Sequence, residues 1–281
     1  MVFTQVTANI DHETGFPRGG NRFNCGTWMD KMGSSERAGN RGLPATPRDG
    51  SAVELVGLCF AVVNFFSKHA DLLEGCQGVT DRASGQVITW TEWAAKIQAN
   101  FERLFWIPTD SQDPSWAYNS GTYRDCVGSS LGYSDHQLRP NFLVAMVLAP
   151  ELFDVGHAWT ALQIVKERLC GPVGMCTLSR DDMAYRGDYD NSNDSDDFHL
   201  ARGYNYHQMA SRKESVDLAA VRQHVDEMFA NLDAALMDSA WRSLPELTNS
   251  QGSVSLLALD YNLEKVAMKG INSGSAELIR Y

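Results

Sequence analysis

Residues 24–49, NCGTWMDKMGSSERAGNRGLPATPRD, place one carboxylate between an aromatic side chain and a cation. Asp30 has Trp28 on one side and Lys31 on the other, and a Gly- and Pro-rich run then leads to Arg48 and Asp49. The stretch lacks the apolar periodicity of a helix or strand, which indicates a structured loop presenting polar groups. A lone loop aspartate is more often a turn former than an acid catalyst, so composition alone favours the structural role for Asp30.

Two further stretches, 109–138 and 171–208, are long, polar and rich in aromatic residues without clear periodicity. A loop of that length in a compact domain is usually functional or disordered, and the aromatic content argues against disorder. Indoles and phenols pack on the apolar faces of sugars, while carboxylates, amides and guanidiniums bind the hydroxyls. His207 in the second stretch is open to three interpretations, as a metal ligand, a sugar donor or a buried structural histidine.

The elements that must position these loops are predicted to be helices. Ser51 and Glu54 match a capping box before an apolar helix that should end near Gly75, and Thr89 and Glu92 match a second one. Further helices are predicted after Pro140, after a cap at Asp154 and from residue 214 to 236, whereas strand signals are sparse. The sequence therefore predicts an all-α fold whose loops gather at one end to form a site.

Charge and composition exclude several functions. The net charge of −11 repels phosphate backbones and argues against a nucleic-acid partner, whereas a neutral glycan would not be repelled. We expect no membrane span, because no apolar run approaches the length of one. We expect no signal peptide, because the start MVFTQVTANIDHETG has neither a basic nor an apolar region. The six cysteines form no C-x-x-C pair, which favours reduced thiols in a cytoplasmic protein.

Metal and cofactor motifs are weak. The run Asp190–Asp196 begins like a calcium loop, but its sixth position is Ser195 instead of glycine and its twelfth is Ala201 instead of glutamate. We therefore interpret it as a solvated acidic turn. There is no phosphate-binding or dinucleotide-binding glycine motif, and we predict neither a metal nor a cofactor.

Several long segments resemble one known family. The run at 24–58, together with LRPNFLVAMVLAPELF, GPVGMCTL, YRGDYDNSNDS, GYNYHQ and LPELTN, is similar in content and order to the C-terminal glucosidase domain of eukaryotic glycogen debranching enzymes. The resemblance covers residues 1–249 and leaves 250–281 as a divergent tail. It implies a glucoamylase-like (α/α)6 toroid and amylo-α-1,6-glucosidase activity, which removes the α-1,6-linked glucose of glycogen limit dextrin with inversion.

The resemblance also implies roles for particular residues. Asp30 of TWMDK falls at the general acid and Glu246 of LPELT at the general base, which are the two carboxyl groups that glycoside hydrolysis needs. Residues in the matched motifs that would hold the glucose are Trp28, Arg48, Asp49, Arg139 and His207.

The chain also departs from the family. It begins shortly before the acid, lacks the stretch that follows NYHQ in the family, and has an unrelated segment after Asn249. A toroid without some of its helices would expose apolar faces, each uncovered Leu, Val or Phe forfeiting about 1.5–3 kcal/mol of burial. An alternative to the hydrolase is therefore a non-catalytic glycan-binding fragment or an incomplete gene product of that enzyme.

Overall fold

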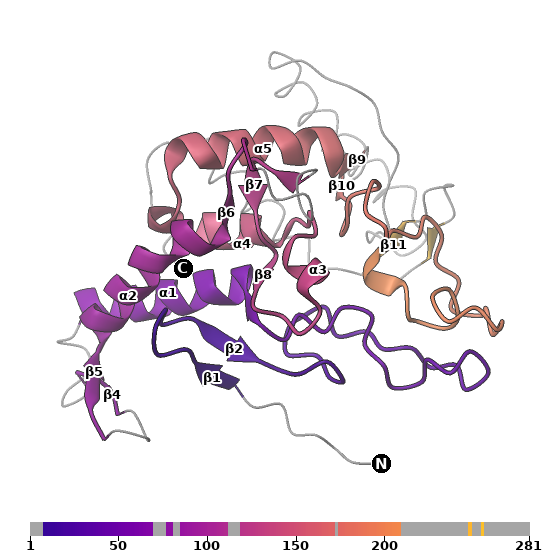
Figure 1. Cartoon of the computed structure of the whole chain (residues 1–281), viewed down its shortest axis with the longest axis horizontal. Coiled ribbons are helices and arrows are strands. Elements are labelled where there is room, and N and C mark those ends of the chain that lie inside the picture. Colours follow the sequence, from indigo (N-terminus) through magenta and orange to yellow (C-terminus); the bar gives the residue numbers. More distant parts are fainter. Residues whose placement is uncertain are drawn as a thin grey trace.

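The structure is a computed structural model that describes residues 8–69, 77–80, 85–111, 119–171, 174–208, 247–248 and 254–255. Its longest elements are helices, so the helical prediction agrees with the described chain (Figure 1). The α-helices are α1 (Val53–Lys68), α2 (Trp90–Phe105), α3 (Gly132–Asp135), α4 (Asn141–Leu148) and α5 (Val155–Arg168), and the 3₁₀ turns are η3 (Pro150–Leu152) and η4 (Tyr206–Gln208).

Short strands, whose sequence signals were sparse, form pairs before, between and after the helices. Within the described ranges all of the pairs are antiparallel and two-stranded. They are β1 (Ala8–Ile10) with β2 (Pro17–Gly19), β3 (Ser51–Ala52) with β8 (Cys126–Val127), β4 (Gly78–Thr80) with β5 (Val87–Thr89), β6 (Trp106–Ile107) with β7 (Thr122–Tyr123), β9 (Cys170–Gly171) with β10 (Gly174–Met175), and β11 (Leu247–Thr248) with β12 (Val254–Ser255). The described part is thus helical with small sheets at the ends of helices.

The core forms where α1 packs against both α2 and α4. A Cβ atom added to Gly57 of α1 would lie 2.5 Å from the Cβ of Ala145 in α4, so a glycine at this point lets the two helices approach. Between α2 and the following segments, aromatic rings fill the core, with Phe101 4.8 Å from Phe153 and 4.9 Å from Phe105 between ring centroids. These contacts hold the first turns of α1 and α4 side by side, which is where the candidate site lies.

The capping box predicted at the start of α1 is wrong. Ala52 is the N-cap and its side chain makes no capping hydrogen bond, while Glu54 turns inward to a buried ion pair with Arg48. Glu54 pairs with Arg48 and does not cap the helix, because a buried guanidinium without a carboxylate partner costs more than a missing cap. The helix also ends at Lys68, before the predicted Gly75, which lies outside the described residues.

Two other predicted caps are confirmed. At α2 the Thr89 hydroxyl accepts from the Glu92 amide, and the Glu92 carboxylate accepts from the Thr89 amide. At α5 the Asp154 carboxylate accepts from the amides of Gly156 and His157. The helix predicted from 214 to 236 lies outside the described residues.

One apolar face of the helical core remains exposed. Leu58, Val62 and Phe65 follow each other along α1, and Val144 and Leu148 extend the same kind of surface on the neighbouring α4. This agrees with the expectation of uncovered apolar surface. No helix in the described ranges is long and apolar enough to cross a membrane. The five cysteines in those ranges are free thiols.

Opposite the helices, two long loops lie side by side (Figure 1). The amide of Asn40 donates to the carbonyls of Phe198 and Ala201, and the Ser35 hydroxyl donates to Asp194. Arg37 adds a two-point ion pair with Asp196. These bonds fix the loop that follows Asp30 onto the segment that precedes His207.

Candidate active site

The segment from Thr27 to Asp30 alternates between solvent and interior. Trp28 is 49% exposed, Met29 is fully buried, and Asp30 is exposed. The backbone of Met29 is tied on both sides, because its amide donates to the Thr27 hydroxyl and its carbonyl accepts from the Thr46 hydroxyl. The buried methionine thus anchors an indole and a carboxylate that both face outward.

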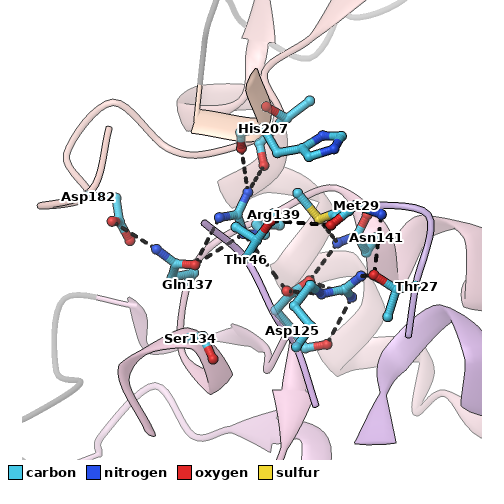
Figure 2. A network of polar contacts seen from close by, with 12 residues as sticks. Thr27, Met29, Thr46, Asp125, Ser134, Gln137, Arg139, Asn141, Asp182 and His207 are labelled. Atoms are coloured by element: carbon cyan, nitrogen blue, oxygen red, sulfur yellow. Dashed lines mark hydrogen bonds and ion pairs between the residues drawn. The ribbon is translucent and has the colours of Figure 1, made fainter. Parts of the chain in front are cut away.

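Beneath this segment lies a buried ion pair centred on Arg48. Its Nε donates to Asp125 Oδ2 at 2.6 Å, and its Nη1 and Nη2 donate to the two carboxylate oxygens of Glu54, each at 2.6 Å. Nη1 also reaches the Thr27 hydroxyl at 3.3 Å (Figure 2). Burial lowers the pKa of Arg48, but the charges of Asp125 and Glu54 outweigh it and raise that pKa well above its usual value. The guanidinium is therefore a permanent charge whose donors are occupied by the protein.

The backbone of Arg48 is held in an unusual conformation. Its φ of +44° lies in the left-handed region, which costs a non-glycine residue about 1–2 kcal/mol. Such a conformation persists only where the surroundings over-determine it, and it is commonest at functional sites. Here the two carboxylates fix the side chain, and Asp49 next to it accepts from the Ser130 amide at 2.9 Å.

A second buried arginine, Arg139, extends the network toward His207. Its Nε and Nη2 donate to Gln137 Oε1, and Gln137 donates in turn to Asp182 Oδ1 at 3.1 Å. Its Nη1 donates to the backbone carbonyls of Thr177 and His207, at 2.9 and 2.7 Å. Arg139 thus ties the start of α4 to the segment that ends at His207 (Figure 2).

His207 lies against the inner edge of Trp28. The Trp28 and His207 rings meet at 83° with centroids 5.2 Å apart, and the ring of Tyr206 also packs against the imidazole, with centroids 4.8 Å apart. Burial lowers the pKa of His207 to about 3, and the positive charges of Arg139 and Lys31 contribute to the same shift. The imidazole is therefore neutral at neutral pH, and its Nε2 makes no hydrogen bond within the described structure. Of the three interpretations, the geometry favours a buried ring that supports Trp28.

Lys31 turns away from the acid that precedes it. Its ammonium lies over the ring of Tyr206, 5.0 Å from the centroid, which is a cation–π contact. Adjacent side chains in this extended segment therefore diverge, and Asp30 and Lys31 do not form an ion pair within the described contacts.

The predicted site residues thus fall into three groups. Trp28 and Asp30 are exposed together, Arg48, Arg139 and His207 are buried beneath them, and Asp49 makes a loop contact nearby. Glu246 lies outside the described residues, so the proposed pairing with Asp30 stays a prediction. For both arginines the predicted contact with glucose also stays a prediction, because the donors seen here are directed at protein acceptors.

Three buried residues of this network were missed by sequence reasoning. They are Asp125, Gln137 and Asn141, and Asn141 links Asp125 to the indole of Trp28. Gln137 and Asn141 flank the Arg139-Pro140 pair, so a polar cluster at the start of an apolar helix was a usable signal. Asp125 lies in the long polar stretch 109–138, but no motif within that stretch distinguishes it.

The acidic run at 190–196 is bonded within the protein. The carboxylate of Asp190 accepts from the amide and hydroxyl of Ser192, while Asp194 and Asp196 pair with Arg202 and Arg37. Among the residues that the structure describes, no group of three or more His, Cys, Asp or Glu side chains has the geometry of a metal site.

Comparison with known proteins identifies the family of this chain from its sequence. The glycogen debranching enzyme of Saccharomyces cerevisiae is 46% identical over 213 residues, which are 72% of this chain and 14% of that enzyme. Neutral trehalase Nth1 from the same yeast aligns at 12% identity and a TM-score of 0.41, over 83% of this chain and 39% of that one, a likeness too low to define the fold. The family described as amylo-alpha-1,6-glucosidase matches residues 2–257, so the chain belongs to the amylo-alpha-1,6-glucosidase family.

Proposed function

We propose that this chain carries the site of an inverting amylo-α-1,6-glucosidase, which removes the α-1,6-linked glucose from glycogen limit dextrin. The observation that supports this best is the exposed pair Trp28 and Asp30, held outward by the buried Met29. The yeast relative that is 46% identical over 213 residues is named a glycogen debranching enzyme, and this chain spans 14% of its length. The proposal concerns the glucosidase step alone.

In this proposal Asp30 is the general acid. Its carboxyl group donates a proton to the glycosidic oxygen as the bond to the anomeric carbon breaks. Glu246 is the general base, which takes a proton from the water that attacks the opposite face of the sugar. Both carboxyl groups come from loops far apart in the sequence, and their spacing decides the stereochemistry.

The remaining residues hold the sugar or the wall on which it lies. Trp28 presents its ring to a pyranose face, and His207 and Arg139 keep that ring and its surroundings in place. Arg48 contacts no sugar in this proposal and supports the site through its ion pairs with Asp125 and Glu54. Asp49 remains a candidate for a hydroxyl contact at the rim of the site.

The wider setting follows from the same proposal. The fold would be a glucoamylase-like (α/α)6 toroid, to which the packed α1, α2, α4 and α5 contribute. Glycogen would be the partner, and the cytoplasm is where such a chain would act. The net charge of −11 disfavours nucleic acid as a ligand.

A second candidate is a glycan-binding chain that does not hydrolyse. It is favoured by the sequence departure after Gln208, since the base at Glu246 follows the altered segment. Such a chain would keep Trp28 and its support but would lack a competent pair of carboxyl groups.

Glucose release from limit dextrin by the purified chain separates the two. We expect the β-anomer of glucose to be released, which proton NMR detects from its anomeric signal. Asp30→Asn or Glu246→Gln should lower the rate of release about 10²–10⁴-fold. Asp190→Asn, a change at an exposed aspartate of the acidic run, is the control and should leave release unchanged. Glycogen co-sedimentation without any release above the Asp30→Asn background would establish the binding protein instead.

A further inference from the structure

The indole of Trp28 is oriented by a hydrogen bond although half of the side chain faces solvent. Its Nε1 donates to Asn141 Oδ1 at 3.1 Å, across 113 positions of sequence. An indole that is 49% exposed lacks the close packing that would otherwise fix its rotamer. Within the described structure the ring's orientation therefore rests on this bond and on the edge of His207.

The amide of Asn141 can take only one orientation. An indole N–H donates and cannot accept, so it must meet Oδ1, and the ionised Asp125 accepts and cannot donate, so it must meet Nδ2. The bond from Nδ2 to Asp125 Oδ1 is 2.7 Å long, and Nδ2 also lies 3.4 Å from the sulfur of Met29. A flipped amide would lose the hydrogen bond to Asp125 and the hydrogen bond from the Trp28 indole, and both losses would leave buried polar groups unpaired.

Asp125 is itself immobilised by charge. Arg48 contacts both of its carboxylate oxygens, at 2.6 and 3.1 Å, and the Nε of Arg139 lies 3.8 Å from Oδ2. Asn141 is the first residue of α4 and is almost fully buried, so the relay is built on a rigid element. Two buried arginines thus fix the carboxylate of Asp125, and Asn141 links that carboxylate to the exposed indole of Trp28.

We propose that Asn141 is a positioning residue for saccharide binding, which sets the Trp28 ring as the aromatic wall beside Asp30. This role rests on the proposed function, since it gives the indole a pyranose to face. Asn141 itself is buried and touches no sugar. Its contribution is that the wall is formed before the substrate arrives, so binding does not have to order a free indole.

The test compares variants of the full chain labelled with ¹⁵N. Trp28→Phe removes one of the seven indole N–H signals and so identifies it. We expect Asn141→Leu, which keeps the branched shape of the side chain but removes its hydrogen bonds, to shift that signal and to speed its hydrogen exchange at least tenfold. The matched control is Asn119→Leu, because Asn119 is equally buried and bridges the carbonyl of His136 and Arg168 without touching Trp28. An unchanged Trp28 signal in Asn141→Leu would overturn the proposal.

Affinity for isomaltose, two glucose units joined α-1,6, gives the second readout. We expect Asn141→Leu to weaken binding at least fivefold in the Trp28 protein and less than twofold in the Trp28→Phe background. Equal losses in both backgrounds would show that Asn141 does not act through the indole, which overturns the proposal. If Trp28→Phe leaves isomaltose affinity unchanged, or if no isomaltose binds, the proposed function fails. The exchange rate of the Trp28 indole proton then still shows whether Asn141 orients the ring.

A wild-type measurement covers the case in which Asn141→Leu does not fold. Trp159 on α5 is 52% exposed, close to the value for Trp28, but its indole N–H makes no hydrogen bond among the described residues. We expect the Trp28 indole proton to exchange at least tenfold more slowly than that of Trp159. Equal exchange rates would mean that the bond to Asn141 does not hold in solution.

Discussion

Arg48 and Asp125, 77 positions apart in sequence, form a buried two-point ion pair with contacts of 2.6 and 3.1 Å. Glu54 pairs with the other side of the guanidinium, so two carboxylates share the charge of Arg48, and Arg139 lies 3.8 Å from Asp125 Oδ2. Because both carboxylates stand at the start of secondary-structure elements, the pair fixes where α1 begins and where the loop carrying Trp28 and Asp30 lies.

Replacing Arg48 by methionine should be strongly destabilising. The change leaves the buried Glu54 without a counter-charge and Asp125 with Arg139 alone at 3.8 Å, and breaking a buried pair in this way costs about 3–5 kcal/mol. Urea unfolding followed by circular dichroism measures the loss. Arg37→Met is the control and should lose much less stability, because the pair of Arg37 with Asp196 is exposed and screened by solvent. Similar unfolding midpoints for the two variants would show that the buried pair is not a structural centre.

Stability should fall on mild acidification because of His207. Its pKa in the folded chain, about 3, lies below the ordinary value of 6.5, so between these pH values the unfolded chain binds a proton that the folded chain does not. The stability contributed by the neutral, buried ring is therefore present above pH 6.5 and is lost as pH falls. His207→Gln should flatten the dependence of unfolding free energy on pH by up to about 1.4 kcal/mol per pH unit between pH 4 and 6.

The exposed His199 gives the comparison for that measurement. His199→Gln should leave the slope close to wild type. If His207→Gln and wild type have the same slope, the ring is protonated in the folded chain and does not lie where the structure places it.

The two capping-box sequences should respond differently to alanine. Thr89→Ala removes a cap that the structure contains and should cost about 1 kcal/mol in thermal or urea unfolding. Ser51→Ala should cost a few tenths of that, since the Ser51 side chain caps nothing at the start of α1. A larger loss for Ser51→Ala than for Thr89→Ala would contradict the observed start of α1.

The exposed apolar face of α1 and α4 should make the chain associate with itself. We expect binding of a hydrophobic dye and a sedimentation coefficient that rises with concentration, and both should decrease on Val62→Lys, because Val62 is 52% exposed. The adjacent Val63 is 3% exposed, so Val63→Lys should instead unfold the chain. A wild-type chain that stays monomeric at all concentrations and binds no dye would show that this face is covered in solution.

The carboxyl groups of Asp30 and Glu246 should lie roughly 6.5–9.5 Å apart in an active chain, which leaves room for the attacking water. A crystal structure with isomaltose bound would measure the separation. A value near 5 Å would indicate a retaining enzyme, and residues on opposite surfaces would remove the catalytic assignment.

Local sequence determined those features that depend on a few neighbouring residues. Thr89 and Glu92 satisfy each other's amides three positions apart, and Asp154 caps the amides that follow it, so both helix starts were predictable. The motif around Asp30 likewise identified the family, because a long run of specific residues carries that information without coordinates. The helical character of the chain followed from apolar periodicity for the same reason.

Tertiary structure decided the features that depend on partners far away in the chain. Glu54 has the right spacing from Ser51 for a cap, yet it pairs with Arg48, because a buried guanidinium without carboxylates costs more than a missing cap. Asp125 had no local signal and Asn141 had only its place in a polar cluster before an apolar helix, since the roles of both come from bonds to Arg48 and Trp28 that span 77 and 113 positions. Charge burial is a property of the folded interior, so sequence could name the exposed acid and the indole beside it, but only the packed chain could show what holds them in place.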